Sequence, residues 1–270
     1  MLRRGASCVV CTIGSVDPTN AAGITLDFAV AASMGARAAS IVTGVTAQNA
    51  MRVATVHPIP PAVIAEQLEL IWEQVRPHAI CIGLIPSGPG ISTVARFLRR
   101  LRPRPPIVVD PVIAASSGGA LLGPHAMRAL PQLLGLASVI TPNVAEATLL
   151  SACQIASLQD AARAAQALTR WGCAVLVTGG HLDRRDCVDT LVTPARGRAG
   201  SRWCLVQRFA SSRLSGALRG AGGILATAIA VELGRGSTLE HAVARGRRIV
   251  RDAWRSARPL GAGTPQFIAT

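Results

Sequence analysis

Short apolar runs alternate with longer helix-like stretches up to about residue 178, and this alternation limits the folds open to the chain. Runs of this length suit buried β-strands, and the stretches between them are long enough for helices. A strand–helix–strand rhythm predicts a mostly parallel sheet with right-handed crossovers and helices on both faces. The predicted strands are residues 8–13, 39–42, 79–84, 107–110, 138–141 and 174–178, and the predicted helices are 24–35, 61–75, 91–101, 124–134, 158–171 and 238–257.

The rhythm changes after Thr178. Two strand-like runs, residues 189–192 and 203–209, flank a segment rich in Pro, Gly and Arg, which predicts a hairpin at the sheet edge. Residues 224–233 are apolar on nearly every side, which predicts a buried helix. We find no linker or repeat, so we expect one α/β domain over residues 1–270.

The amino-acid composition limits which kinds of ligand and macromolecule the protein can bind. All 28 basic residues are arginine and the formal net charge is +14, so the surface should attract anions, including phosphorylated ligands. The chain has only four Phe, four Trp and no Tyr, and no recognition motif accompanies its arginine runs, so we expect no specific nucleic-acid partner.

No apolar run is long enough for a membrane helix, and the start of the chain fits a first strand better than a signal peptide. We therefore expect a cytoplasmic protein without a membrane partner. The seven cysteines are odd in number and lie mostly in strand-like stretches, which favours reduced thiols over disulfides.

Ligands of parallel sheets bind at the carboxyl ends of the strands, and polar residues follow several predicted strands here. The loop after the first strand, residues 14–24, can wrap a compact ligand, and Asp27 lies one turn inside the next helix. Gln48 follows the second strand and offers an amide to a heterocycle edge. N-caps and ordinary turns would give the same patterns.

The later strands end in candidate phosphate and metal ligands. Asp110 follows a very apolar strand, where a carboxylate can serve metal or phosphate chemistry. Asn143 and Glu146 follow the next strand, three residues apart, although this spacing also suits a helix N-cap. Thr178 and Gly180 end the next strand, just before His181.

Gly220, Gly222 and Gly223 precede the predicted buried helix. A helix N-terminus presents unpaired N–H groups, and glycines let a phosphate approach them closely. A tight turn that only packs against neighbouring backbone would have the same sequence.

Taken in order, these segments resemble the hydroxymethylpyrimidine/phosphomethylpyrimidine kinases of thiamin biosynthesis. Residues 14–27 resemble the motif GSD-x-x-GGAGIQAD with one inserted residue, and Thr46–Asn49 matches TAQN. Residues 81–85 resemble KIGML, and residues 141–147 match TPN-x-x-EA. Residues 110–113 with Ser117 and Gly118 resemble DPVM-x-x-SG. The resemblance spans nearly the whole chain.

This resemblance implies a ribokinase-like α/β/α sandwich that transfers the γ-phosphoryl group of ATP, with Mg²⁺, to hydroxymethylpyrimidine and then to its monophosphate. It also implies a possible homodimer. The residues that it assigns are Gly23, Asp27 and Gln48 to the pyrimidine, Asn143, Thr178 and Gly180 to ATP, Asp110 and Glu146 to the metal, and Gly220, Gly222 and Gly223 to the catalytic loop.

The catalytic loop departs from the family pattern. HGTGC is replaced by Arg219–Gly223, so Gly223 stands in place of the cysteine base and Ala221 in place of a phosphate-contacting threonine. Thr178 replaces the lysine of VKGGH, and Arg219, Arg184 or Arg185 are candidate substitutes for its charge. Two other readings stay open: a non-catalytic pyrimidine- or nucleotide-binding descendant, and a related kinase of B6 vitamers.

Overall fold

A computed structural model describes residues 7–114, 119, 121–180, 182, 185–196, 202–261 and 263–267. Its strands form one nine-stranded sheet in the order β3-β2-β1-β4-β5-β6-β7-β8-β9. The strands are β1 (Val9–Val16), β2 (Arg37–Gln48), β3 (Val53–Pro58), β4 (Ala79–Ile82), β5 (Ile107–Val109), β6 (Val139–Ile140), β7 (Ala174–Val177), β8 (Asp186–Arg196) and β9 (Arg202–Ser212).

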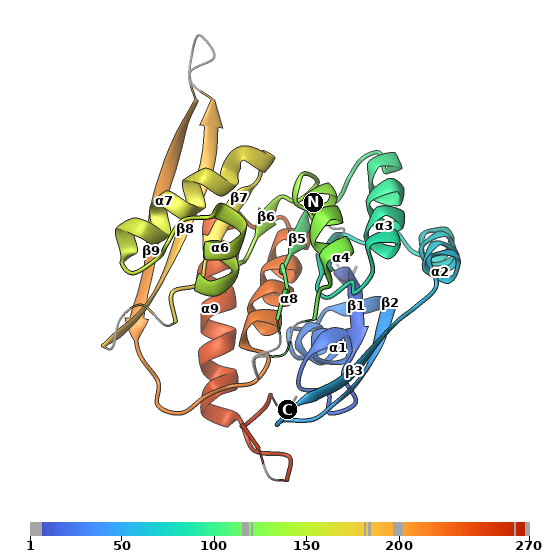
Figure 1. The fold of residues 1–270 in the computed structure, drawn as a ribbon, viewed down its shortest axis with the longest axis horizontal. Helices are drawn as coiled ribbons and strands as arrows, with labels where there is room; N and C mark the ends of the chain where they lie inside the picture. The colour runs from blue at the N-terminus through green and yellow to red at the C-terminus, as the bar shows by residue number, and fades with distance from the viewer. Residues whose placement is uncertain are drawn as a thin grey trace.

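The central strands are parallel, as the sequence rhythm predicts. β1 pairs in parallel with β2 and β4, and β4 to β7 continue in parallel. The edges are antiparallel: β3 pairs with β2 on one side, and the predicted hairpin β8–β9 pairs with β7 on the other. The hairpin stands at the far end of the sheet from β3 (Figure 1).

Helices cover both faces of the sheet (Figure 1). On one face lie α1 (Gly23–Ser33), α8 (Ala221–Gly234) and α9 (Leu239–Ser256). The other face carries α2 (Pro61–Gln74), α3 (Gly88–Arg100), α4 (Pro124–Ala129), α5 (Pro131–Leu134), α6 (Val144–Ser151) and α7 (Leu158–Leu168), which is followed by a short 3₁₀ turn, Thr169–Trp171. The fold is therefore the three-layer α/β/α sandwich that the sequence predicts.

Alternation along the strands assigns their side chains to the two layers. In β5, Ile107 and Val109 join the core under α2–α7, whereas Val108 faces α8. Both sets are fully buried, so β5 is apolar at every position. Asp110 follows Val109, and its parity therefore directs it to the α8 side.

Some predicted boundaries are wrong. β2 runs to Gln48, so Thr46–Gln48 belong to the strand rather than to a loop after it. β3 was not predicted, because most of its residues are exposed at a sheet edge and it lacks a buried apolar run. α3 begins at Gly88, where Ser87 caps the helix by accepting a hydrogen bond from the Gly90 N–H. Pro131 divides the helix predicted over 124–134 into α4 and α5.

Several predicted positions lie outside the described residues, namely Ser116–Gly118, His181 and Arg184. All seven cysteines are free thiols, as predicted. Within the described chain, no helix combines the length and the apolar character needed to cross a membrane.

Candidate active site

The carboxyl ends of the parallel strands are connected by backbone hydrogen bonds along one edge of the sheet. The Gly83 N–H donates to Ile13 O at 2.9 Å, and the Asp110 N–H donates to Ile82 O at 2.8 Å. Further along, the Thr178 N–H donates to Pro142 O at 3.0 Å. The residues that follow β4, β5, β6 and β7 therefore lie side by side at the carboxyl end of the sheet, where ligands of such sheets bind.

The glycine segment at the start of α8 lies between two buried carboxylates. A Cβ atom on Gly222 would lie 3.3 Å from Asp110 Oδ2, and one on Gly223 would lie 3.7 Å from Asp27 Oδ1. Gly222 and Gly223 are inside the first turn of α8, not in a loop before it as the sequence suggested. Their N–H groups belong to the helix end that has no intrahelical acceptors.

Gly220 makes this arrangement possible. Its φ is +78°, and an added Cβ would lie only 2.2 Å from Ala21 O. Both the left-handed conformation and the close approach require glycine. The turn therefore packs α8 directly against the segment that leads into α1.

Asp27 projects from α1 toward α8. Thr227, one turn after Gly223, donates its hydroxyl to Asp27 Oδ1 at 2.8 Å, and no other hydrogen bond to the Asp27 carboxyl joins it to the described residues. Asp27 is 6% exposed. Burial raises the pKa of Asp27 to about 7, although the Thr227 hydrogen bond acts in the opposite direction.

Asp110 and Glu146 form a second acidic pair at the ends of β5 and β6. Burial raises the pKa of Asp110 well above its usual value, and the nearby charges of Glu146 and Asp27 raise it further. Burial raises the pKa of Glu146 to about 7, opposed by hydrogen bonds from the N–H groups of Asn143 and Ile113. Asn143 and Glu146 also form the capping box that begins α6.

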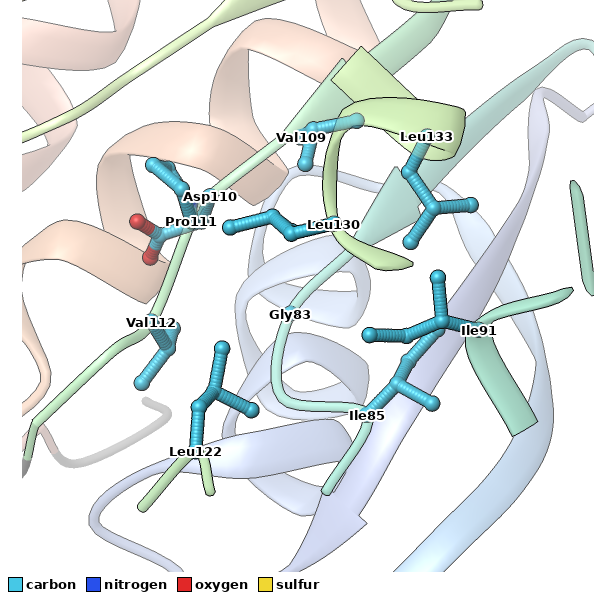
Figure 2. Close-up of a pocket in the computed structure, with 10 residues that line it drawn as sticks. All are labelled: Gly83, Ile85, Ile91, Val109, Asp110, Pro111, Val112, Leu122, Leu130 and Leu133. Carbon is cyan, nitrogen blue, oxygen red and sulfur yellow. The ribbon is translucent and has the colours of Figure 1, made fainter. Parts of the chain in front are cut away.

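Figure 2 shows a small pocket beside the Asp110 backbone, on the face of the sheet that α3, α4 and α5 cover. The pocket has a volume of about 10 Å³ and its lining is largely apolar, so it holds at most one water. The carboxyl oxygens of Asp110 point away from Ile91 and Leu133. A larger cavity of about 390 Å³ lies between α7 and the β8–β9 hairpin, near Thr169 and Trp203, and does not include the carboxylates.

The loop after β7 is held by a buried ion pair. Asp189 of β8 accepts a hydrogen bond from the Gly179 N–H at 2.8 Å, and Arg247 of α9 donates to its second oxygen. Arg247 also donates to Cys187 O at 3.0 Å and to Ser211 Oγ at 2.9 Å. On the other side, Arg213 donates to Gly180 O at 2.6 Å. Arg213 therefore lies beside the loop after β7, where the uncharged Thr178 replaces the lysine of the family motif.

Arg219 connects segments at the opposite end of the site. Its guanidinium lies 3.4 Å from Asp17 Oδ2 and donates to Asn49 O at 2.6 Å. Asp17 is 1% exposed and the Arg219 side chain 10%, so this ion pair is buried. Arg219 therefore holds the first loop beside the end of β2 and is not a free cation for phosphate.

The family model described as phosphomethylpyrimidine kinase matches residues 17–267 of this chain. The chain belongs to the phosphomethylpyrimidine kinase family. It is 37% identical over 257 residues to a hydroxymethylpyrimidine/phosphomethylpyrimidine kinase of Mycobacterium tuberculosis, covering 94% of this chain and 90% of that one. It is also 35% identical to the thiamine biosynthesis bifunctional protein ThiED of Geobacter sulfurreducens. That match covers 94% of this chain but only 50% of the longer ThiED protein.

Solved structures of the phosphomethylpyrimidine kinase family and its neighbours share the fold. The crystal structure of phosphomethylpyrimidine kinase from Clostridium difficile superimposes with a TM-score of 0.78 at 30% identity, covering 92% of this chain and all of that one (100%). The pyridoxal kinase of Staphylococcus aureus, solved with pyridoxal, gives a TM-score of 0.85 at 23% identity over 98% and 94% of the two chains. The ribokinase-like fold predicted from the motifs is confirmed.

Within this phosphomethylpyrimidine kinase fold, the predicted site residues do not all converge. Asp27, Asp110, Gly222 and Gly223 lie together, and Glu146 lies close enough to raise the pKa of Asp110. Gly23 has φ +68°, and an added Cβ would lie 2.1 Å from Ser15 O, which explains the glycine by backbone packing. Gln48 pairs with Val53 of β3 and has no described contact with the carboxylates.

Three site residues of this phosphomethylpyrimidine kinase family member were not predicted from the sequence, namely Thr227, Asp189 and Arg247. Thr227 lies four residues after Gly223 on one helix face, and this spacing was the only local signal for it. Asp189 and Arg247 are 58 residues apart, and no spacing rule connects them.

Proposed function

We propose that this protein transfers the γ-phosphoryl group of ATP to hydroxymethylpyrimidine and to its monophosphate. The observation that carries the proposal is the glycine turn of α8, held between Asp27 and Asp110 at the carboxyl edge of a ribokinase-like sheet. Phosphoryl transfer depends mostly on positioning and on stabilising charge, and helix N–H groups supply both.

In this proposal the two ends of the site bind different substrates. The pyrimidine lies near Gly23, Asp27 and Gln48, beside the loop that the Arg219–Asp17 ion pair holds. ATP lies along the ends of β6 and β7, near Asn143, Thr178 and Gly180, with Arg213 close to Gly180. The transferring phosphoryl group sits at Gly220, Gly222 and Gly223, where Gly222 and Gly223 provide N–H groups.

The acidic pair suits a magnesium ion. Asp110 and Glu146 are buried, burial raises the pKa of each carboxyl, and no cation of the described chain is among the causes of either pKa shift. The described residues contain no group of three or more metal-binding side chains, which fits an ion held by one or two carboxylates and by nucleotide phosphates. When bound, the ion would neutralise charge on the transferring phosphoryl group.

The test is phosphorylation of hydroxymethylpyrimidine by the purified full chain with ATP and Mg²⁺, followed by separation of the mono- and diphosphate products. The proposal expects both products, with ATP depleted only when pyrimidine and Mg²⁺ are present. Heat stabilisation by the pyrimidine without any turnover would instead support a binding protein. Pyridoxal in place of the pyrimidine tests the B6-kinase reading in the same assay.

A further inference from the structure

We propose that the Asp27 carboxylate accepts the proton of the pyrimidine hydroxymethyl group during phosphoryl transfer. The inference rests on the proposed function and assigns one of its chemical steps. A hydroxyl acceptor must lose its proton as it attacks phosphorus, and a positioned base accelerates that loss. The residue at the helix start that faces Asp27 is Gly223, which has no side chain to take the proton.

The geometry places Asp27 at the required point. Its Oδ1 atom is 3.7 Å from the position of a Gly223 Cβ, so the carboxylate occupies the space that a short side chain at residue 223 would reach. Oδ1 is fixed by Thr227, whereas Oδ2 has no hydrogen-bond partner among the described residues. That free oxygen, on a residue that keeps 6% exposure, is available to a substrate hydroxyl.

The other carboxylates are less suited to this step. Both oxygens of Glu146 accept backbone N–H groups, and Glu146 caps α6 on the nucleotide side. Asp110 lies next to Gly222 and shares the acidic pair that the proposed function gives to the metal. Asp27 alone of the three projects from α1, the helix that follows the predicted substrate loop.

The groups facing Asp27 leave it able to hold a proton. The Cys81 thiol of β4 lies 3.6 Å from Thr227 Oγ1, and the Asp110 carboxyl lies just after the end of β5. The Thr227 hydroxyl comes from α8. No described cation perturbs Asp27, and burial raises its pKa to about 7, which suits a general base at neutral pH.

The hydroxyl O–H bond breaks and its proton moves to an Asp27 oxygen. The hydroxyl oxygen forms a bond to the γ-phosphorus, and the bond from that phosphorus to the β,γ-bridging oxygen breaks to release ADP. Asp27 then returns the proton to solvent.

The experiment compares the native chain with Asp27→Asn, which keeps the size and the hydrogen bond to Thr227. We expect kcat to fall by about 10²- to 10⁴-fold, while KM and the thermal shifts with pyrimidine and with ADP stay within about threefold of native values. The rise of activity with pH up to about 7 should disappear in the variant. Asp252→Asn, an exposed carboxylate of α9, is the matched control with native kinetics.

A second variant separates chemistry from folding. Asp27→Asn/Gly223→Asp returns a carboxylate from the opposite helix, and recovery of at least about tenfold in kcat is expected if a base is what was lost. If Asp27→Asn retains more than about a third of native kcat, or if the native acid limb near pH 7 is absent, the proposal is overturned. A native chain that turns over no pyrimidine at all overturns the proposed function and this step together, whereas an active native chain with an equally active variant overturns this step alone.

Discussion

The Thr227 hydroxyl donates a hydrogen bond to the Asp27 carboxylate across 2.8 Å, although 200 residues separate the two in the sequence. This bond joins α1 to α8 one turn beyond the glycine segment. It also stabilises the ionised form of Asp27 against the effect of burial, so it helps to set the pH at which Asp27 can accept a proton.

Thr227→Val should therefore raise the pKa of Asp27, because it removes the donor that favours the carboxylate. A hydrogen bond to a charged group contributes about 1.5–3 kcal/mol, so the acid limb of the kcat/KM profile should move up by roughly one to two pH units. Thr227→Ser keeps the hydroxyl and serves as the control. Identical profiles for the two variants would contradict the role assigned to this bond.

Replacement of Gly220 by alanine should disrupt the site more than its φ value alone explains. Gly236 has φ +87° and no atom within 4 Å of an added Cβ, so Gly236→Ala measures backbone strain alone, about 1–2 kcal/mol. At Gly220 the Cβ would also meet Ala21 O at 2.2 Å. We expect Gly220→Ala to lower the free energy of unfolding clearly further and to abolish most activity. Urea unfolding and turnover measure both; equal losses in the two variants would refute the packing argument.

Loss of the buried ion pair between Asp189 and Arg247 should affect ATP more than the pyrimidine. Arg247→Ala leaves Asp189 buried without its cation, which typically costs about 3–5 kcal/mol. Asp189 can still accept the Gly179 N–H through Oδ1, but its carboxylate is no longer held in place by Arg247, so KM for ATP should rise while KM for the pyrimidine changes little.

Arg255→Ala breaks an exposed ion pair with Asp252 on the same helix and should cost less than about 1 kcal/mol. Thermal unfolding and the two KM values distinguish the variants. A pyrimidine KM that rises as much as the ATP KM would argue against a specific role at the nucleotide loop.

The buried carboxylates should make stability fall as pH rises. Asp27, Asp110 and Glu146 all have pKa values raised by burial above those of the unfolded chain. Their contribution to stability is fully present below the unfolded values near 4. It is lost as pH rises through about 7 for Asp27 and Glu146, and as pH rises through the raised folded pKa for Asp110. Asp110→Asn should therefore raise Tm at pH 8.5 and have little effect at pH 4.5.

Mg²⁺ should raise the Tm of the native chain more at pH 8.5 than at pH 5.5, because it compensates the ionised pair. Asp110→Asn should weaken that response, whereas Asp252→Asn should not. Calorimetry at the two pH values measures these shifts. A Tm difference between the native chain and Asp110→Asn that is independent of pH would contradict the raised pKa of Asp110.

Much of the fold was predictable because periodicity records burial directly. The strands of the parallel section read as short apolar runs, since helices cover both of their faces, and the residues just after them include the acidic groups of the site. The largely exposed edge strand β3 was not predicted, because it has neither a buried apolar run nor a regular alternation.

The sequence by itself determined the α/β layers, the polar residues at the strand ends and the glycines at the start of α8. Only the tertiary structure decided how those residues act. Asp27 meets Thr227, Arg219 meets Asp17 across 202 residues, and Asp189 meets Arg247 across 58. Such pairs follow no local spacing rule. Burial removes these groups from water, which raises the pKa of the carboxyls that lack a cation and keeps the buried arginines paired with their carboxylates.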